Sequence, residues 1–235
     1  MEIIALLNKV LLPIHIFFAF GSLIIFWIPV FTKLGGDMHR KTGKAYVICM
    51  WVVVLTSIWL SINNVIEGHY NASIFLGFIA MITANPLWYG IAVLKHKKGL
   101  TKSYNRKQMA FNLLIFLSGA GLVILGVSIG PENGILMIIF GILGLTSGGA
   151  IIKDLRNPPT ESNWFITHIR GMVISGIATY TAFFAFGGRT LFEHILTGYW
   201  MIIPWVAPTV IGTLIMRRMR KKYEKKTVVA QIVSN

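Results

Sequence analysis

Charged residues are scarce in this chain of 235 residues. They make up 13% of the sequence, whereas soluble proteins carry roughly a quarter. Hydrophobic residues account for 55%, and the mean hydropathy is +0.69. This balance excludes an ordinary soluble domain and predicts an integral membrane protein.

Cysteine is nearly absent, because Cys49 is the single one in the sequence. One cysteine excludes an intramolecular disulfide and a metal site or cluster built from cysteines. Cys49 falls inside an apolar run, where we expect the thiol to pack as a small side chain and to stay unreactive.

Several signatures of catalysis and transport are missing as well. No aspartate lies inside an apolar run and Glu67 lies at the end of one, which disfavours an ion pump driven by a buried carboxylate. The last apolar run has no central lysine for a retinal Schiff base. No GxSxG motif, Walker loop or central carboxylate pair occurs, so hydrolase and nucleoside-triphosphatase chemistry lack their residues.

Long apolar runs are what the sequence does contain. A membrane-spanning helix needs about 20 mainly apolar residues. The qualifying runs are 9–31, 45–66, 72–94, 110–130, 134–152, 166–187 and 195–216. We therefore predict an all-α fold with seven transmembrane helices over residues 1–216 and a basic cytoplasmic tail over residues 217–235.

Positive charge is distributed unevenly around these runs. The loops after the first, third and fifth runs and the tail hold 4, 6, 3 and 7 Lys and Arg residues, together 20. The opposite side holds Lys9 and Arg189. Because Lys and Arg concentrate on the cytoplasmic side, we predict an outside N-terminus and a cytoplasmic C-terminus, in the inner membrane of a bacterium.

The net charge of +14 predicts lipid partners and not nucleic acid. Nucleic-acid binding needs a basic stripe on a soluble face, but these basic residues flank apolar runs. The tail is expected to contact anionic lipid head groups. The oligomeric state stays open.

Two histidines that enter the predicted bundle from the cytoplasmic side are the sharpest candidates for chemistry. His39 and His168 each begin a stripe of polar and small residues, on the second and sixth runs. Such stripes face other helices, because lipid offers polar atoms no partner. Neutral imidazole binds haem iron or other transition metals and shuttles protons. The alternative is that both histidines bond to loop carbonyls or lipid head groups at helix starts.

Further residues are assigned to the same pocket. Arg40 can hold a phosphate, a carboxylate or a haem propionate, or it can act as a topology charge like its lysine neighbours. Tyr46 and the intramembrane His15 complete the predicted cofactor site, although a neutral His15 can instead bond a neighbouring polar side chain. The polar residues expected to line the pocket are Asn85, Gln108, Asn112, Ser57, Ser175 and Thr179.

A second candidate site lies on the outer side. Glu67, His69, Glu193 and His194 carry the atom types that bind zinc. They lack a ligand spacing such as HExxH, so the alternative is that they are solvated loop residues.

Two further patterns concern the scaffold. Asn85-Pro86 predicts a kink in the third helix, because proline removes a backbone donor. Small residues on the fourth and fifth runs predict close packing of this pair. They are Gly119, Gly126, Gly130, Gly141, Gly144 and Gly148.

These motifs resemble an uncharacterised family of bacterial multi-pass membrane proteins, defined only as a domain of unknown function. The matching residues are His15 with Gly21, His39-Arg40-x-x-Gly43-Lys44, and Trp164-x-x-x-His168-x-x-x-Met172 with Ile177-Ala178-x-x-Thr181-Ala182-Phe183. The resemblance implies a helical bundle in a bacterial inner membrane and brings no established activity.

A looser similarity is to cytochrome b561-like and ferric-reductase membrane bundles. Those bundles hold two haems on four histidines within the spans, whereas only His15 lies well inside a span here. The similarity therefore implies one b-type haem at most, held by His39 and His168 near the cytoplasmic edge.

Three functions stay open from the sequence. The first is haem- or metal-dependent membrane redox chemistry at the His39 and His168 pocket, with Arg40 as an anion clamp. The second is a transporter or carrier of a small or lipid-like anion, hinged at Asn85-Pro86. The third is a structural or regulatory membrane subunit.

Overall fold

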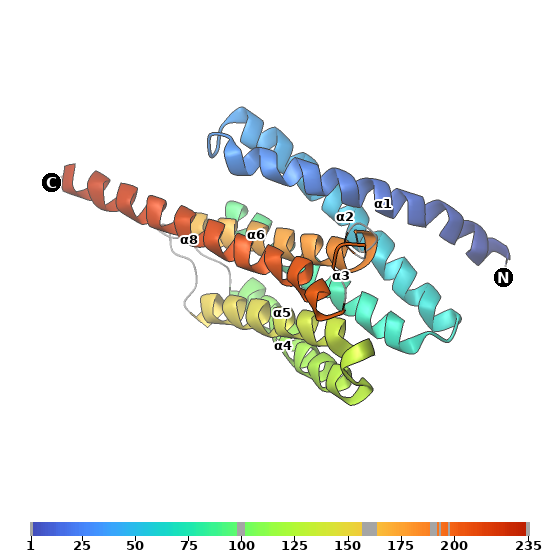
Figure 1. The fold of residues 1–235 in the computed structure, drawn as a ribbon. Coiled ribbons are helices and arrows are strands. Elements are labelled where there is room, and N and C mark those ends of the chain that lie inside the picture. The colour runs from blue at the N-terminus through green and yellow to red at the C-terminus, as the bar shows by residue number, and fades with distance from the viewer. Residues whose placement is uncertain are drawn as a thin grey trace.

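Long helices account for most of the described chain in this computed structural model (Figure 1). The structure describes residues 2–97, 102–156, 164–188, 192, 194–196 and 198–233. The elements in chain order are α1 (Glu2–Phe31), α2 (Asp37–Ile66), α3 (Tyr70–Lys95), α4 (Lys102–Ile129), α5 (Pro131–Arg156), α6 (Trp164–Ala182), the π-helix η1 (Phe183–Gly187), the 3-10 helix η2 (Gly198–Met201) and α8 (Ile202–Val233). No strand occurs in these ranges, so the predicted all-α class is confirmed.

Six of the helices are long and apolar enough to cross a membrane. The segments are Leu6–Phe31, Asp37–Ile66, Tyr70–Lys95, Tyr104–Ile129, Gly134–Lys153 and Trp164–Gly187. Large apolar side chains stand on their outer faces, with exposures of 73% at Phe17, 70% at Ile124 and 65% at Val127. Exposed apolar surface on this scale marks a surface that faces lipid or a partner. The chain is therefore a multi-pass membrane protein.

The predicted seventh span differs from the other six. Its apolar helical part, residues 202–216 of α8, covers roughly 22 Å at about 1.5 Å per residue, which is shorter than the ~30 Å hydrocarbon core. α8 nevertheless packs along α6, and the N- and C-terminal ends lie at opposite ends of the bundle (Figure 1). The seventh crossing and the orientation of the termini stay predictions. The helix continues through the predicted tail as far as Val233, and residues 234 and 235 lie outside the described ranges.

Several helices begin or end beyond the apolar runs that predicted them. α2 begins at Asp37, eight residues before the run 45–66, so His39 and Arg40 lie in its first turn and not in a loop. Hydropathy locates the part of a helix that contacts hydrocarbon, whereas the backbone hydrogen bonds continue into the interface. Because of this extension, the side chains of His39 and Arg40 project from a helix and not from a loop.

α3 is the central helix of the bundle. It packs against α2 on one side and α6 on another, and α6 in turn packs against α8. α1 covers α2, whereas α4 and α5 form a closely packed hairpin that meets α3. The four helices α1, α2, α3 and α6 thus surround the region into which the candidate histidines project.

The predicted close packing of α4 against α5 is confirmed. A β-carbon added to Gly119 would lie 2.9 Å from the carbonyl oxygen of Gly141, and one added to Gly126 would lie 2.7 Å from that of Gly134. Gly130 has another role, because its φ of +94° turns the chain from α4 into α5. Without a hydrophobic driving force between helices in lipid, such backbone contact supplies the packing energy.

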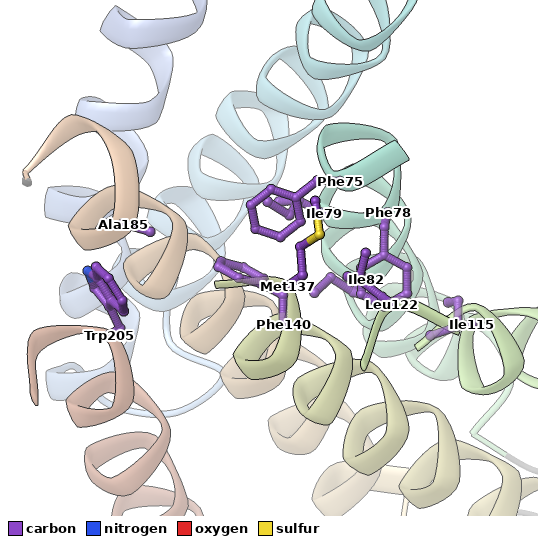
Figure 2. Close-up of a cluster of buried hydrophobic side chains, with 10 residues drawn as sticks. All are labelled: Phe75, Phe78, Ile79, Ile82, Ile115, Leu122, Met137, Phe140, Ala185 and Trp205. Atoms are coloured by element: carbon purple, nitrogen blue, oxygen red, sulfur yellow. The ribbon is translucent and has the colours of Figure 1, made fainter. Parts of the chain in front are cut away.

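A buried apolar cluster joins α3 to this hairpin (Figure 2). Its members are Phe75, Phe78, Ile79 and Ile82 on α3, Ile115 and Leu122 on α4, Met137 and Phe140 on α5, Ala185 on η1 and Trp205 on α8. The ring of Phe75 meets that of Phe140 edge to face with centroids 5.3 Å apart. The cluster packs the N-terminal half of α3 against the hairpin, whereas the C-terminal end of α3 lines a cavity.

Candidate functional site

A partly open cavity of about 500 Å³ lies among α1, α2, α3 and α6, and Met219 of α8 also lines it. Most of its wall is apolar, including Phe26, Val47, Ile91, Ile169 and Met172. Its polar lining residues are His39, Arg40, Lys44, Tyr46, Lys95 and His168. The cavity thus combines a mostly apolar wall with two imidazoles and several cations.

His168 is positioned by the closest approach of α3 and α6. Gly90 and Gly171 meet there, because a β-carbon on Gly171 would lie 2.7 Å from the Cα of Gly90. His168 lies almost one turn before Gly171 on α6, and its Nδ1 lies 2.8 Å from the carbonyl oxygen of Gly90. Small residues at the crossing therefore bring the ring onto the backbone of α3.

His39 is positioned by the short connection between α1 and α2. Gly35 turns the chain with a φ of +73° and Gly36 caps α2. The first turn of α2 thus returns beside the end of α1. There the Nδ1 of His39 lies 3.0 Å from the carbonyl oxygen of Pro29.

The two imidazoles share one hydrogen-bonding pattern. A carbonyl oxygen only accepts hydrogen bonds, so the Nδ1 atoms of His39 and His168 carry the donated proton. In the neutral ring this leaves the lone pair on Nε2, and neither Nε2 has a hydrogen-bond partner among the described residues. Metal-binding histidines characteristically donate their other ring N–H to a carbonyl or carboxylate in this way.

Tyr46 is 3% exposed, lines the cavity and connects α2 to α6. Its Oη lies 3.1 Å from the Oγ of Ser175. Thr179, one turn further, donates to the carbonyl oxygen of Ser175 at 2.9 Å and lies 3.5 Å from the Sδ of Met50. The prediction that Ser175 and Thr179 line the pocket is wrong, because their hydroxyls are used in the contact between α2 and α6.

Arg40 lines the cavity, but its guanidinium contacts the carboxylate of Asp37. It pairs with Asp37 at 2.8 Å in an exposed salt bridge one turn apart on α2, a kind of pair worth about 0–1 kcal/mol. Lys44 on α2 and Lys95 on α3 also line the cavity, and neither has a carboxylate partner among the described residues. The sequence predicts Lys44 to be a topology charge and counts Lys95 among the positive residues of a loop. The helical period does not group Lys44 with His39, because five residues turn a helix by about 140°.

His15 lies apart from this cavity. Its Nδ1 is 2.9 Å from the Oγ1 of Thr56 in the contact between α1 and α2, and it is not among the lining residues. The assignment of His15 to the same cofactor site is therefore wrong. The hydroxyl of Thr56 satisfies the ring, which is the alternative that the sequence leaves open.

Three amides predicted to line the pocket instead join α3 to α4. The side chain of Asn85 donates to Asn112 at 2.6 Å and accepts from Gln108 at 2.6 Å. Asn112 also donates to the carbonyl oxygen of Gln108 at 2.7 Å. These residues are 2%, 0% and 6% exposed in the order Asn85, Asn112, Gln108. The polar face of α3 turns here to α4 and not to the cavity.

Ser57 also has a local role. Its Oγ donates to the carbonyl oxygen of Val53 on its own helix at 2.7 Å, so it does not line the cavity.

The residues considered for zinc are described in part, and no metal site is found among those that the structure describes. Glu67 accepts a hydrogen bond from Asn63 at 2.8 Å, and His69 and His194 are exposed. Glu193 lies outside the described residues. Within the described ranges, no group of three or more His, Cys, Asp or Glu residues could hold a metal ion.

No family model, curated protein or solved structure matches this chain. Function is therefore argued from the geometry of the cavity.

Proposed function

We propose that the cavity binds one b-type haem, which the Nε2 atoms of His39 and His168 would hold, and that the protein transfers electrons in the membrane. The shared orientation of the two rings carries this proposal, because each Nδ1 is tied to a backbone carbonyl within one cavity. This leaves both Nε2 atoms available to iron.

The number of ligands favours haem over a bare metal ion. A structural zinc site needs four protein ligands, and the described residues supply no cluster of that size. A porphyrin brings its own nitrogens to the iron, so two imidazoles complete the coordination. A haem held by His39 and His168 would keep no protein-free position for a substrate and would supply electron transfer.

The cavity also suits the rest of such a ligand. Its volume of about 500 Å³ lies within the range of roughly 300–1,000 Å³ for small-molecule and cofactor sites. The apolar walls suit a macrocycle, and the cations suit acidic substituents.

Haem titration of the purified protein tests this proposal. Wild type is expected to bind one haem per chain with a six-coordinate spectrum. His39→Ala and His168→Ala should each weaken binding by at least about tenfold, which corresponds to about 1.4 kcal/mol. The matched control is His96→Ala, because His96 packs beside Tyr104 with centroids 5.7 Å apart and is not a lining residue. Equal haem affinity in all four proteins would overturn the proposal.

A second candidate is a carrier of a lipid-like anion. The observation that favours it is the combination of apolar walls with lysines that have no carboxylate partner among the described residues, since any amphipathic anion suits that combination. This function predicts a protein that binds no haem and whose unfolding temperature rises with a long-chain fatty acid or an alkyl phosphate.

We further infer that the cavity faces the cytoplasm of a bacterium. The basis is the concentration of 20 of the 22 Lys and Arg residues in the segments at that end of the predicted bundle.

A further inference from the structure

We infer that Lys44 and Lys95 bind the acidic groups of the ligand in this cavity, so that the site selects a ligand with two carboxylates over its uncharged ester. The inference rests on the proposed function, because it concerns the same ligand. It assigns the role of anion contact to two lysines and not to Arg40.

The charge around the cavity is unbalanced. No carboxylate is among its lining residues, and Asp37 is already paired with Arg40. Lys44 and Lys95 have no such partner in the described part of the chain. Unpaired cations beside apolar walls create a positive potential, which favours an anion in the space between them.

The two lysines approach the cavity from neighbouring walls. α2 begins and α3 ends at the same end of the bundle (Figure 1). Lys95 lies five residues beyond Gly90, the anchor of His168, or about 7.5 Å further toward the end of α3. Lys44 lies the same distance into α2 from His39. Their flexible stems can follow the apolar wall while the ammonium groups stay at its polar edge.

Four porphyrins separate the role of the lysines from that of the histidines. Haem and iron-free protoporphyrin both carry two charged propionates. In the dimethyl ester of each porphyrin, both propionates are uncharged. The purified full chain is titrated with all four probes. Wild type is expected to bind each acid more tightly than its ester, and the preference should fall as ionic strength rises.

Two variants test which lysine causes the preference for the acid over its ester. Lys44→Met and Lys95→Met keep most of the apolar stem and remove the charge. Each should lower the preference for the acid by about fivefold, because exposed charge pairs are worth up to about 1 kcal/mol. The esters should bind unchanged. Lys41→Met is the control, since Lys41 is exposed on the same helix and is not a lining residue.

The outcomes separate the two proposals. Equal binding of acids and esters, or an acid preference that both lysine variants retain, overturns the lysine assignment while haem ligation stands. Equal binding of haem and protoporphyrin, unchanged by His39→Ala and His168→Ala, overturns haem ligation while the lysine assignment stands. Failure of all four porphyrins to bind overturns both.

Discussion

Gly90 of α3 and Gly171 of α6 meet with no side chain between them, and the carbonyl of Gly90 accepts the hydrogen bond from His168. The packing of two helices and the orientation of a candidate ligand therefore depend on one contact. A change in the distance between these helices moves His168 relative to the cavity.

Gly171→Ala is expected to destabilise the protein and to weaken haem binding. The new β-carbon would lie 2.6 Å from the carbonyl oxygen of Pro86 and 2.7 Å from the Cα of Gly90, both backbone atoms. Overpacking of this kind costs about 1–3 kcal/mol. The measurement is the unfolding temperature in mild detergent together with haem affinity. Gly121→Ala is the control, because a β-carbon there meets nothing within 4 Å. Equal effects of the two substitutions would contradict the account.

Asn85→Ala is expected to lower stability without changing haem affinity. The substitution removes the bonding partner of both Gln108 and Asn112 in a buried contact, and each orphaned buried group costs about 1–3 kcal/mol. Asn64→Ala is the matched control, because among the described residues the side chain of Asn64 donates to the carbonyl oxygen of Leu60 on its own helix, at 2.8 Å, and bonds to no other helix. A loss of haem affinity equal to that of His168→Ala would place Asn85 in the site after all.

Cysteine labelling tests the number of crossings. In a Cys49→Ser background, Lys33→Cys, Glu67→Cys and Lys221→Cys are exposed to a membrane-impermeant maleimide in spheroplasts. Seven crossings with an outside N-terminus predict that Glu67→Cys reacts and that the other two variants are protected. Reaction of Lys221→Cys with continued protection of Lys33→Cys would instead mean six crossings.

Hydropathy was sufficient to predict the membrane class and the positions of six helices, because contact with hydrocarbon requires long apolar runs. It did not locate the start of α2 at Asp37. Polar residues such as His39 continue the helix beyond its apolar run, and the Nδ1 of His39 donates to the carbonyl oxygen of Pro29. Hydropathy does not show whether α8 crosses the membrane, since the apolar part of α8 is short.

The site was predictable only in part. The helical period placed His39, Tyr46 and His168 on faces that turn inward, and all three line one cavity. The period does not specify which helices are neighbours, so the predicted place of Asn85 at the cavity is wrong and this residue contacts α4. The sequence does not single out Lys44, because a lysine beside an apolar run also fits a topology charge.

The visible absorption spectrum of the protein, purified in mild detergent and recorded as isolated and after reduction, tests the central claim most directly. The account predicts a sharp Soret band that shifts on reduction and weakens when His39 or His168 is replaced by alanine. A featureless spectrum that stays featureless after haem is added would contradict it.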